Sequence, residues 1–155
     1  MKISSNYHLK PHNTFGIEAK CNLFIEFSDE NELQEALTRV RESNLPFLIL
    51  GEGSNLLLTG DYEGMVLHSD IKGIEATETE DGILVKAGSG VVWDELVEHC
   101  INNGWHGLEN LSYIPGTVGA SAVQNIGAYG CEAKDAIYNI EAIDIETGTK
   151  HVISN

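Results

Sequence analysis

Residues 110–130 read Asn-Leu-Ser-Tyr-Ile-Pro-Gly-Thr-Val-Gly-Ala-Ser-Ala-Val-Gln-Asn-Ile-Gly-Ala-Tyr-Gly, and this stretch says most about the fold. Its glycines stand among uncharged side chains that can donate or accept hydrogen bonds. A glycine leaves room for the main chain to approach another surface closely, and neutral polar groups can bind without adding a net charge. The stretch therefore predicts a backbone that lies against a flat ligand.

A second loop of the same character, residues 51–55, reads Gly-Glu-Gly-Ser-Asn and follows the apolar run 47–50. Residues 23–27 predict a strand, and Ser28 or Asp29 is expected to cap a helix with Leu33, Ala36, Leu37 and Val40 on one face. The run 47–50 has no alternation, which is typical of a strand covered on both faces. Residues 23–50 therefore predict a right-handed βαβ unit, completed by a short strand at 65–67. The loop 51–55 would then begin at the carboxyl end of a parallel strand, where open α/β sheets bind ligands.

The second half of the chain predicts a separate set of elements. Residues 83–87 alternate as a strand does, and a helix follows with Trp93, Leu96, Val97, Cys100 and Ile101 on one stripe, ended by Asn103-Gly104. Pro115 is expected to open a short helix at 116–121 whose free N–H groups point at a ligand. Residues 138–145 and 150–153 predict a hairpin around Thr147-Gly148. We expect two α/β lobes, residues 1–70 and 71–155, and a chain that ends one strand after a turn suggests a truncated protein.

Charge and composition exclude several classes of function. Nine basic and 24 acidic residues give a net charge of −15, which repels nucleic acid and anionic membranes. A diphosphate ligand would have to be held by backbone N–H groups and helix ends. No stretch has the length of a signal peptide or a membrane span, and three cysteines without a paired motif fit a reducing compartment, so we expect a cytoplasmic protein.

Known motifs for nucleotide binding, hydrolysis and metal binding are not matched by this sequence. Gly51-Glu52-Gly53 begins like a dinucleotide fingerprint, but Leu56 stands at its sixth position, where a small residue is needed. There is no phosphate-binding Gly-Lys loop, no hydrolase elbow and no metal-ligand spacing among the histidines, which are His8, His12, His68, His99, His106 and His151. We expect the histidines at the surface, with His12 and His106, which lie near the motif segments, serving packing or solvation. The loop 51–55 alone is as consistent with a plain turn as with a ligand site. For the stretch 110–130 the alternative to a ligand site is a buried crossover that holds no ligand. Gln124 and Asn125, amides among apolar residues, favour a ligand over packing.

The combined motifs resemble the UDP-N-acetylenolpyruvoylglucosamine reductase family. The resemblance rests, in chain order, on residues 9–17, 48–55, 107–111, 114–121 and 124–130. It implies the two-lobed fold of the p-cresol methylhydroxylase and vanillyl-alcohol oxidase type around an extended FAD, with the pyrophosphate on the 51–55 loop and the 114–121 segment. The cofactor-binding residues implied are Gly51, Glu52, Gly53, Ser54, Asn55, Ile114, Pro115, Gly116, Thr117, Gly119, Ala120, Ser121, Gln124, Asn125, Gly127 and Tyr129.

The resemblance also implies a reaction. NADPH reduces FAD, and the reduced flavin passes a hydride to the enolpyruvyl ether of a nucleotide sugar. The family's catalytic arginine, serine and glutamate and its substrate domain match no position here, so we expect a cofactor-binding piece with no catalytic residue, no metal and a tendency to self-associate. The alternatives are an FAD-dependent alcohol or sugar oxidase of the same fold, and a fragment that holds no cofactor.

Overall fold

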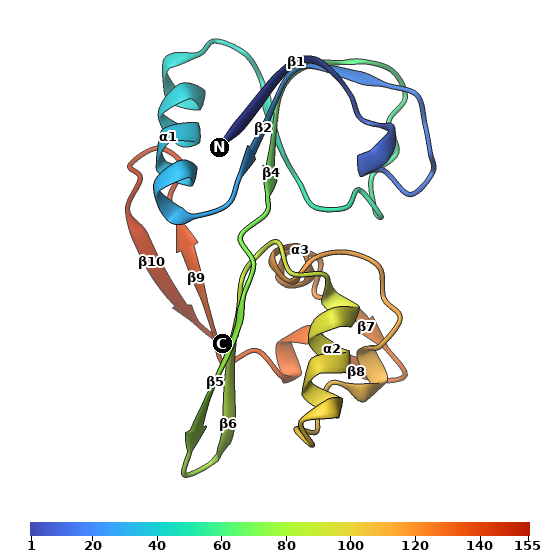
Figure 1. The fold of residues 1–155 in the computed structure, drawn as a ribbon, viewed down its shortest axis with the longest axis vertical. Coiled ribbons are helices and arrows are strands. Elements are labelled where there is room, and N and C mark those ends of the chain that lie inside the picture. Colours follow the sequence, from blue (N-terminus) through green and yellow to red (C-terminus); the bar gives the residue numbers. More distant parts are fainter.

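The computed structural model describes residues 1–155 and shows two groups of elements stacked along the long axis of the molecule (Figure 1). The first group is a four-stranded sheet in the order β1-β2-β4-β3. Its strands are β1 (Lys2–His8), β2 (Lys20–Phe27), β3 (Phe47–Leu50) and β4 (Tyr62–Ser69), with a short 3-10 helix, η1 (Lys10–His12), after β1. β1 is antiparallel to β2, whereas β2 and β3 both run parallel to β4. The carboxyl ends of the three parallel strands therefore meet at one edge of the sheet.

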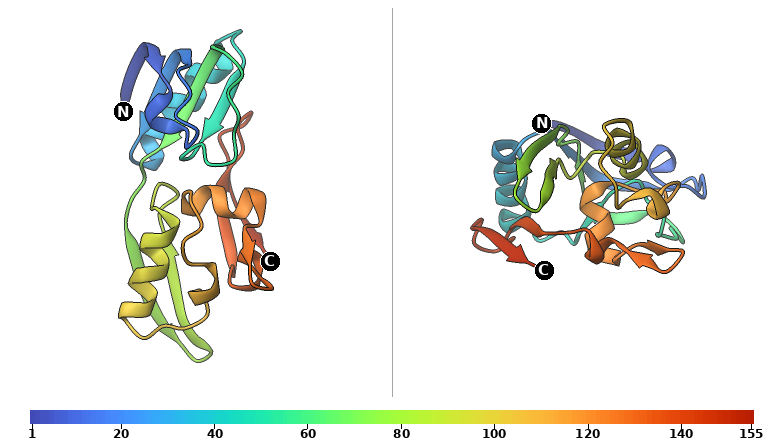
Figure 2. Two further views of the ribbon diagram at one scale, coloured as in Figure 1. Left: turned by 90° about the vertical axis from the view of Figure 1, so that its right-hand side faces the viewer. Right: turned by 90° about the horizontal axis from the view of Figure 1, so that it is seen from below.

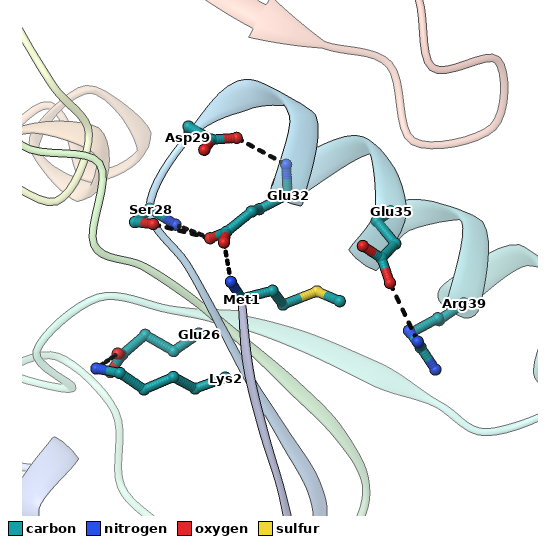
Figure 3. Close-up of polar contacts among 8 residues, drawn as sticks. All are labelled: Met1, Lys2, Glu26, Ser28, Asp29, Glu32, Glu35 and Arg39. Atoms are coloured by element: carbon teal, nitrogen blue, oxygen red, sulfur yellow. Dashed lines mark hydrogen bonds and ion pairs between the residues drawn. The ribbon is translucent and has the colours of Figure 1, made fainter.

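Helix α1 (Glu30–Glu42) covers one face of this sheet and begins at a side-chain cap. Asp29, one of the two expected cap residues, accepts a hydrogen bond from the Glu32 N–H at 2.8 Å. The Glu32 carboxylate in turn accepts bonds from the N–H and hydroxyl of Ser28 and from the terminal ammonium of Met1 (Figure 3). The bond to Asp29 satisfies one of the donors that a helix start leaves free, and the bonds to Glu32 hold the preceding residue and the chain start against the helix, so the cap fixes where α1 leaves the sheet.

Two apolar clusters lie on the two faces of the sheet. One, between α1 and the sheet, contains Ile25, Leu37 and Met65, and the other, beneath the long loops, contains Leu9 and Phe24 among its buried residues. The central strand is β4, whose residues 64–67 are all buried.

The expectation that the run 47–50 is covered on both faces is wrong. β3 is an edge strand, and Phe47 and Ile49 are 37% and 59% exposed. The expected parallel direction is confirmed, but β4, expected only as a short third strand, lies between β2 and β3. An apolar run without alternation does not distinguish a central strand from an apolar edge strand. The burial of such a run depends on where the later strands of the chain join the sheet.

The second group packs around α2 (Trp93–Asn102), whose buried stripe joins Val91 and Leu111 in a third cluster. Its other elements are β5 (Ile74–Thr79), β6 (Gly82–Ala87), η2 (Glu109–Leu111), α3 (Val118–Gln124), β7 (Gly127–Ala128), β8 (Cys131–Glu132) and η3 (Ala133–Asp135). The expected stop at Asn103-Gly104 is confirmed, with Gly104 at φ +72°, but Ile101 is 44% exposed and lies off the stripe. No helix in the structure is both long enough and apolar enough to cross a membrane.

The expected hairpin is present as β9 (Asn139–Ile143) and β10 (Lys150–Ser154), and it runs from the second group back to the first (Figures 1 and 2). Its turn meets α1: Gln34 donates to the Gly148 carbonyl at 2.7 Å and Arg41 to the Ile145 carbonyl at 2.9 Å. Ile143 and Ile145 pack against the cluster under α1. The hairpin therefore connects the two groups. Although it follows residue 70 in the chain, it packs against elements that precede residue 70.

Candidate functional site

The two segments expected to bind a cofactor meet between the two groups of elements. The loop 51–55 leaves β3 and contacts the segment 115–120: the Ser54 hydroxyl donates to the Pro115 carbonyl at 3.3 Å. The Gly116 N–H donates to the Glu52 carboxylate at 3.1 Å. A Cβ on Gly51 would lie 3.1 Å from the Thr117 hydroxyl oxygen, so the backbones approach closely there. The contact brings together residues more than sixty positions apart.

Close packing within the chain accounts for three of these glycines. Gly53 has φ +65°, and a Cβ on it would stand 2.2 Å from the His12 carbonyl oxygen. A Cβ on Gly119 would stand 2.8 Å from that of Ser89, and Gly51 is held against Thr117. Packing alone leaves no room for a side chain at Gly53 and Gly119 and little room for one at Gly51, without any ligand. The glycines alone therefore do not locate a pyrophosphate, and the expectation that a ligand contacts them stays a prediction.

The free hydrogen-bond donors lie in the loop 51–55. None of its five backbone N–H groups donates a hydrogen bond within the chain. The start of α3 differs, because the N–H groups of Val118 and Gly119 donate to the carbonyls of Val91 and Ser89 at 2.9 and 3.0 Å. The expected short helix at 116–121 begins instead at Val118, and the prediction that its first N–H groups point at a ligand is wrong for these two and for Gly116. The segment 88–92 occupies the place in front of the helix.

Beside the loop 51–55 lies a cleft of about 360 Å³ that residues of both groups line. Its lining residues are Pro11, His12, Asn13, Thr14, Glu52, His68, Lys72, Gly90, Val92 and Thr117. The expected surface position is wrong for His68, which is half-buried, whereas His12 is half-buried in a packing role that agrees with the expectation; the two rings meet edge to face with centroids 4.7 Å apart. Burial, and then the neighbouring His68, lowers the pKa of His12 below its usual 6.5. Lys72 donates to the Gly90 carbonyl and pairs with Asp70 at 3.1 Å.

The remaining expected residues lie along α3 and past its end. Ile114 packs on the third cluster, and the buried Ser121 hydroxyl donates to the Val118 carbonyl, so it is engaged within the helix. Gln124 is exposed and therefore needs no partner for its amide, contrary to the expectation. Asn125, at φ +45°, ends α3 and accepts a bond from the Lys134 N–H at 3.0 Å.

Gly127 and Asn125 border a second, shallower hollow of about 640 Å³ beyond α3. Tyr129, two residues after Gly127 in the chain, has φ +52° and is 90% exposed. A non-glycine residue in the left-handed region costs energy and is more common at functional sites. The expected residues thus form two regions: loop 51–55 with 114–121, and the stretch 124–129.

Sequence reasoning missed Asp94, which shapes the approach to Pro115. From the first turn of α2 its carboxylate accepts bonds from the Ser112 hydroxyl at 2.9 Å and from the Tyr113 N–H at 2.7 Å. Tyr113 is held at φ +65° with its ring 91% exposed. An acidic residue near a helix start usually indicates only a favourable interaction with the helix dipole, so the pattern gave no sign of this role.

The arrangement suits the diphosphate of a dinucleotide. Unpaired N–H groups on consecutive residues form an anion-binding concavity that needs no basic patch. That requirement fits a chain of net charge −15. The Ser54 and Glu52 side chains fix the loop against the second group, so the donors are held in place before a ligand arrives.

Comparison with known proteins identifies the family and its cofactor. A family described as "FAD binding domain" matches residues 21–154, so the chain belongs to this family, its cofactor is FAD, and its fold is that of the p-cresol methylhydroxylase and vanillyl-alcohol oxidase type. It is 52% identical over 151 residues to the UDP-N-acetylenolpyruvoylglucosamine reductase of Bacteroides fragilis strain ATCC 25285, covering 97% of this chain and 45% of that protein. With the Pseudomonas aeruginosa reductase it shares 45% identity over 150 residues, covering 96% and 44%.

Among solved structures, a reductase of the same name (MurB) from Thermus caldophilus superposes with a TM-score of 0.74 at 25% identity. That match covers 99% of this chain and 52% of the other. The chain thus spans about half the length of the relatives it matches.

Proposed function

We propose that this chain is the FAD-holding part of a UDP-N-acetylenolpyruvoylglucosamine reductase. The observation that carries the proposal is the loop 51–55, where five backbone N–H groups without a partner lie against the segment 115–120. The names of relatives at 52% and 45% identity support the assignment of the parent enzyme.

In this proposal each region of the site has its own task. The loop 51–55 binds the pyrophosphate through its N–H groups and the exposed Asn55 amide, and residues 114–121 support it from the second lobe. Residues 124–129, with the exposed ring of Tyr129, face the flavin side of the cofactor. FAD supplies the hydride chemistry when bound, and this chain binds it, orients it and keeps water from part of its surface. Residues 1–70 and 71–155 act as the two lobes of the clasp.

The activity of the whole protein extends the proposal. The parent enzyme would use NADPH to reduce FAD and would deliver a hydride to an enolpyruvyl nucleotide sugar in peptidoglycan synthesis, in the cytoplasm. General acid catalysis and a clamp for the substrate carboxylate would come from residues outside these 155. No residue of this chain is assigned a catalytic role.

Binding of free FAD tests the proposal directly. We expect the purified chain to bind FAD with quenching or a shift of the flavin signal, and to bind FMN, which lacks the pyrophosphate, more weakly. Asn55→Asp places a negative charge beside the proposed diphosphate while the shape of the side chain stays nearly the same. FAD affinity should therefore fall about tenfold or more. Asn44→Asp adds the same charge on the exposed segment after α1 and is the matched control.

The affinities of the parent and of the two variants for FAD and FMN together test the proposed pyrophosphate site. Equal binding of FAD and FMN by calorimetry, or equal FAD affinity of the Asn55→Asp and Asn44→Asp variants, would place the pyrophosphate elsewhere. Circular dichroism and urea unfolding check that all three proteins are equally folded.

A further inference from the structure

His12 lies against the loop 51–55 through its backbone, and His68 contacts Leu50, the residue just before the loop. The His12 carbonyl oxygen fills the space where a side chain at position 53 would stand. The His68 ring, on β4, is 3.0 Å through Nδ1 from the carbonyl of Leu50, the last residue before the loop. Both residues also line the interlobe cleft with Glu52 and Lys72. A change in the His68 ring therefore acts on the start of the donor loop as well as on the cleft, whereas the His12 ring lines the cleft and its backbone packs against the loop.

The hydrogen bonds fix which ring nitrogens are free. A carbonyl oxygen can only accept, so Nδ1 of His68 carries a proton and Nε2 of the neutral ring has a lone pair. His12 Nε2 is 3.1 Å from the Tyr7 hydroxyl, which leaves its Nδ1 without a partner. The neutral His68 thus offers an acceptor at its free nitrogen, whereas its cation offers a donor. An anion beside that nitrogen requires the cation.

The rings are too close for both to be charged at little cost. Their centroids are 4.7 Å apart, and the aromatic ring of Phe24 packs against both. Burial and then His68 lower the pKa of His12, so at neutral pH without a ligand this ring is neutral. We therefore expect the pair to carry at most one positive charge.

We propose that His12 and His68 form a proton-linked anion site, in which one imidazole takes up a proton from solvent when the diphosphate of a dinucleotide enters the cleft. The inference rests on the proposed function in one respect: it takes the diphosphate of FAD as the anion. The loop N–H groups bind the diphosphate at any pH, and the imidazolium adds a charge-assisted hydrogen bond that exists only with the proton. At the same time the cation strengthens the bond of His68 to the Leu50 carbonyl and holds the start of the loop.

Charged groups on several elements surround the histidine pair. Glu26 on β2 favours the charged form of His12, while Lys72 lines the same cleft as a cation already paired with Asp70. Glu52 is the only carboxylate lining the cleft, and it accepts from the Gly116 N–H, while the Tyr7 hydroxyl lies 3.1 Å from Nε2 of His12. An entering diphosphate raises the pKa of the pair above its ligand-free value. The extra affinity is therefore full below the ligand-free pKa and is lost as the pH rises through the ligand-bound pKa.

The first test follows the histidine ring signals by NMR from about pH 5 to pH 8.5, with and without ADP-ribose. This probe has a diphosphate diester of constant charge in that range and no flavin. We expect the titration midpoint of His12 or His68 to rise by about one pH unit with the probe, as for a group that gains an anion within a few ångströms. The midpoint of His8, which is exposed on β1, should stay unchanged. No rise at saturating ADP-ribose overturns the inference, whether or not FAD binds.

The second test measures protons directly. FAD is titrated calorimetrically at two pH values in buffers of different ionisation enthalpy. We expect uptake of up to about one proton per FAD and a dissociation constant that rises by up to about tenfold per pH unit. The double variant His12→Gln/His68→Gln should still bind FAD but without uptake, and His8→Gln should behave like the parent.

The outcomes separate the two proposals. FAD binding with no proton uptake, or uptake that persists in the double variant, overturns the proton-linked site and leaves the flavin assignment standing. Absence of FAD binding at every pH overturns the proposed function, and the ADP-ribose titration then decides the histidine pair by itself. Circular dichroism of the double variant excludes a loss of fold.

Discussion

At the scale of single residues, Gly53 and Glu52 show why neighbours in one loop have different roles. Gly53 has a left-handed backbone and no space for a side chain beside the His12 carbonyl. Glu52 extends across the gap to the Gly116 N–H and so joins the two lobes. One residue sets the shape of the loop and the other sets its position.

Substitution of Gly53 by alanine should destabilise the fold before it affects any ligand. Its Cβ would meet the His12 carbonyl at 2.2 Å on a backbone of φ +65°, so we expect Gly53→Ala to lower the free energy of unfolding by about 2 kcal/mol or more. Gly60, in the same long loop, has open space and no positive φ, and Gly60→Ala should change stability by less than about 1 kcal/mol. Urea unfolding of both variants checks this, and equal stability of the two would contradict it.

Glu109 should contribute to the pH dependence of stability in acid. Hydrogen bonds from its own backbone N–H and that of Gly107, and then from His106, lower its pKa from 4.5 to about 2. The folded pKa is thus below the unfolded value, so the stabilisation is present above about pH 4.5 and is lost as the pH falls toward 2. The parent should be more stable than Glu109→Gln at about pH 6, and the gap should narrow by about pH 3. A gap in urea midpoints that stays constant over that range would exclude this role.

At the scale of elements, the sequence analysis succeeded where a signal is local. The helix stripe of α1, its cap, the stop at Gly104 and the hairpin at 147–148 depend on residues close in the chain. It failed for β3, because the burial of an apolar run depends on β4 inserting on one side only, fifteen residues later. The start of α3 was displaced for a similar reason, since the carbonyls of Ser89 and Val91 take the donors that the sequence left free.

The hairpin β9–β10 should stabilise the first lobe although it follows the second in the chain. Ile145 is half-buried against the cluster under α1, so Ile145→Ala should lower the free energy of unfolding by about 2 kcal/mol. Val152→Ala, an exposed position on β10, is the control and should have little effect. Amide exchange should show the loss of protection in α1 itself. Protection in α1 equal to that of the parent would show that the hairpin only rests on the helix.

At the scale of the whole molecule, distant parts of the chain form both the site and the exposed surface. The pairing of His12 with His68 was not predictable, because one comes from η1 and the other from β4, and neither has a motif spacing. The meeting of loop 51–55 with 115–120 was expected only through family resemblance. Composition predicted that backbone N–H groups and helix ends, rather than a basic patch, would hold an anion; the N–H groups of the loop 51–55 are free, but those at the start of α3 are bonded within the chain.

The exposed apolar strands should cause self-association that increases with salt. Ile49 and Phe47 on the edge strand β3, and Val152 and Ile153 on β10, are exposed, and unpaired strand edges with apolar side chains tend to pair. A net charge of −15 opposes this association at low ionic strength and is screened at high salt. Sedimentation velocity over a range of concentration and salt should show the change, and Ile49→Lys should reduce it. A monomer under all conditions would contradict the prediction.

The contacts of the hairpin with α1 also set an order of events during synthesis. Gln34 meets Gly148, and Lys150 pairs with Glu30 at 2.7 Å, so these partners are 114 and 120 residues apart. At about 5–20 residues per second, a ribosome needs on the order of ten seconds between making α1 and making the strand that covers it. During that interval the apolar cluster under α1 lacks Ile143 and Ile145 and is partly open to water. Contacts of such long sequence separation also slow the final folding step. The nascent first lobe is therefore the stage at which a chaperone would find an exposed surface on this chain.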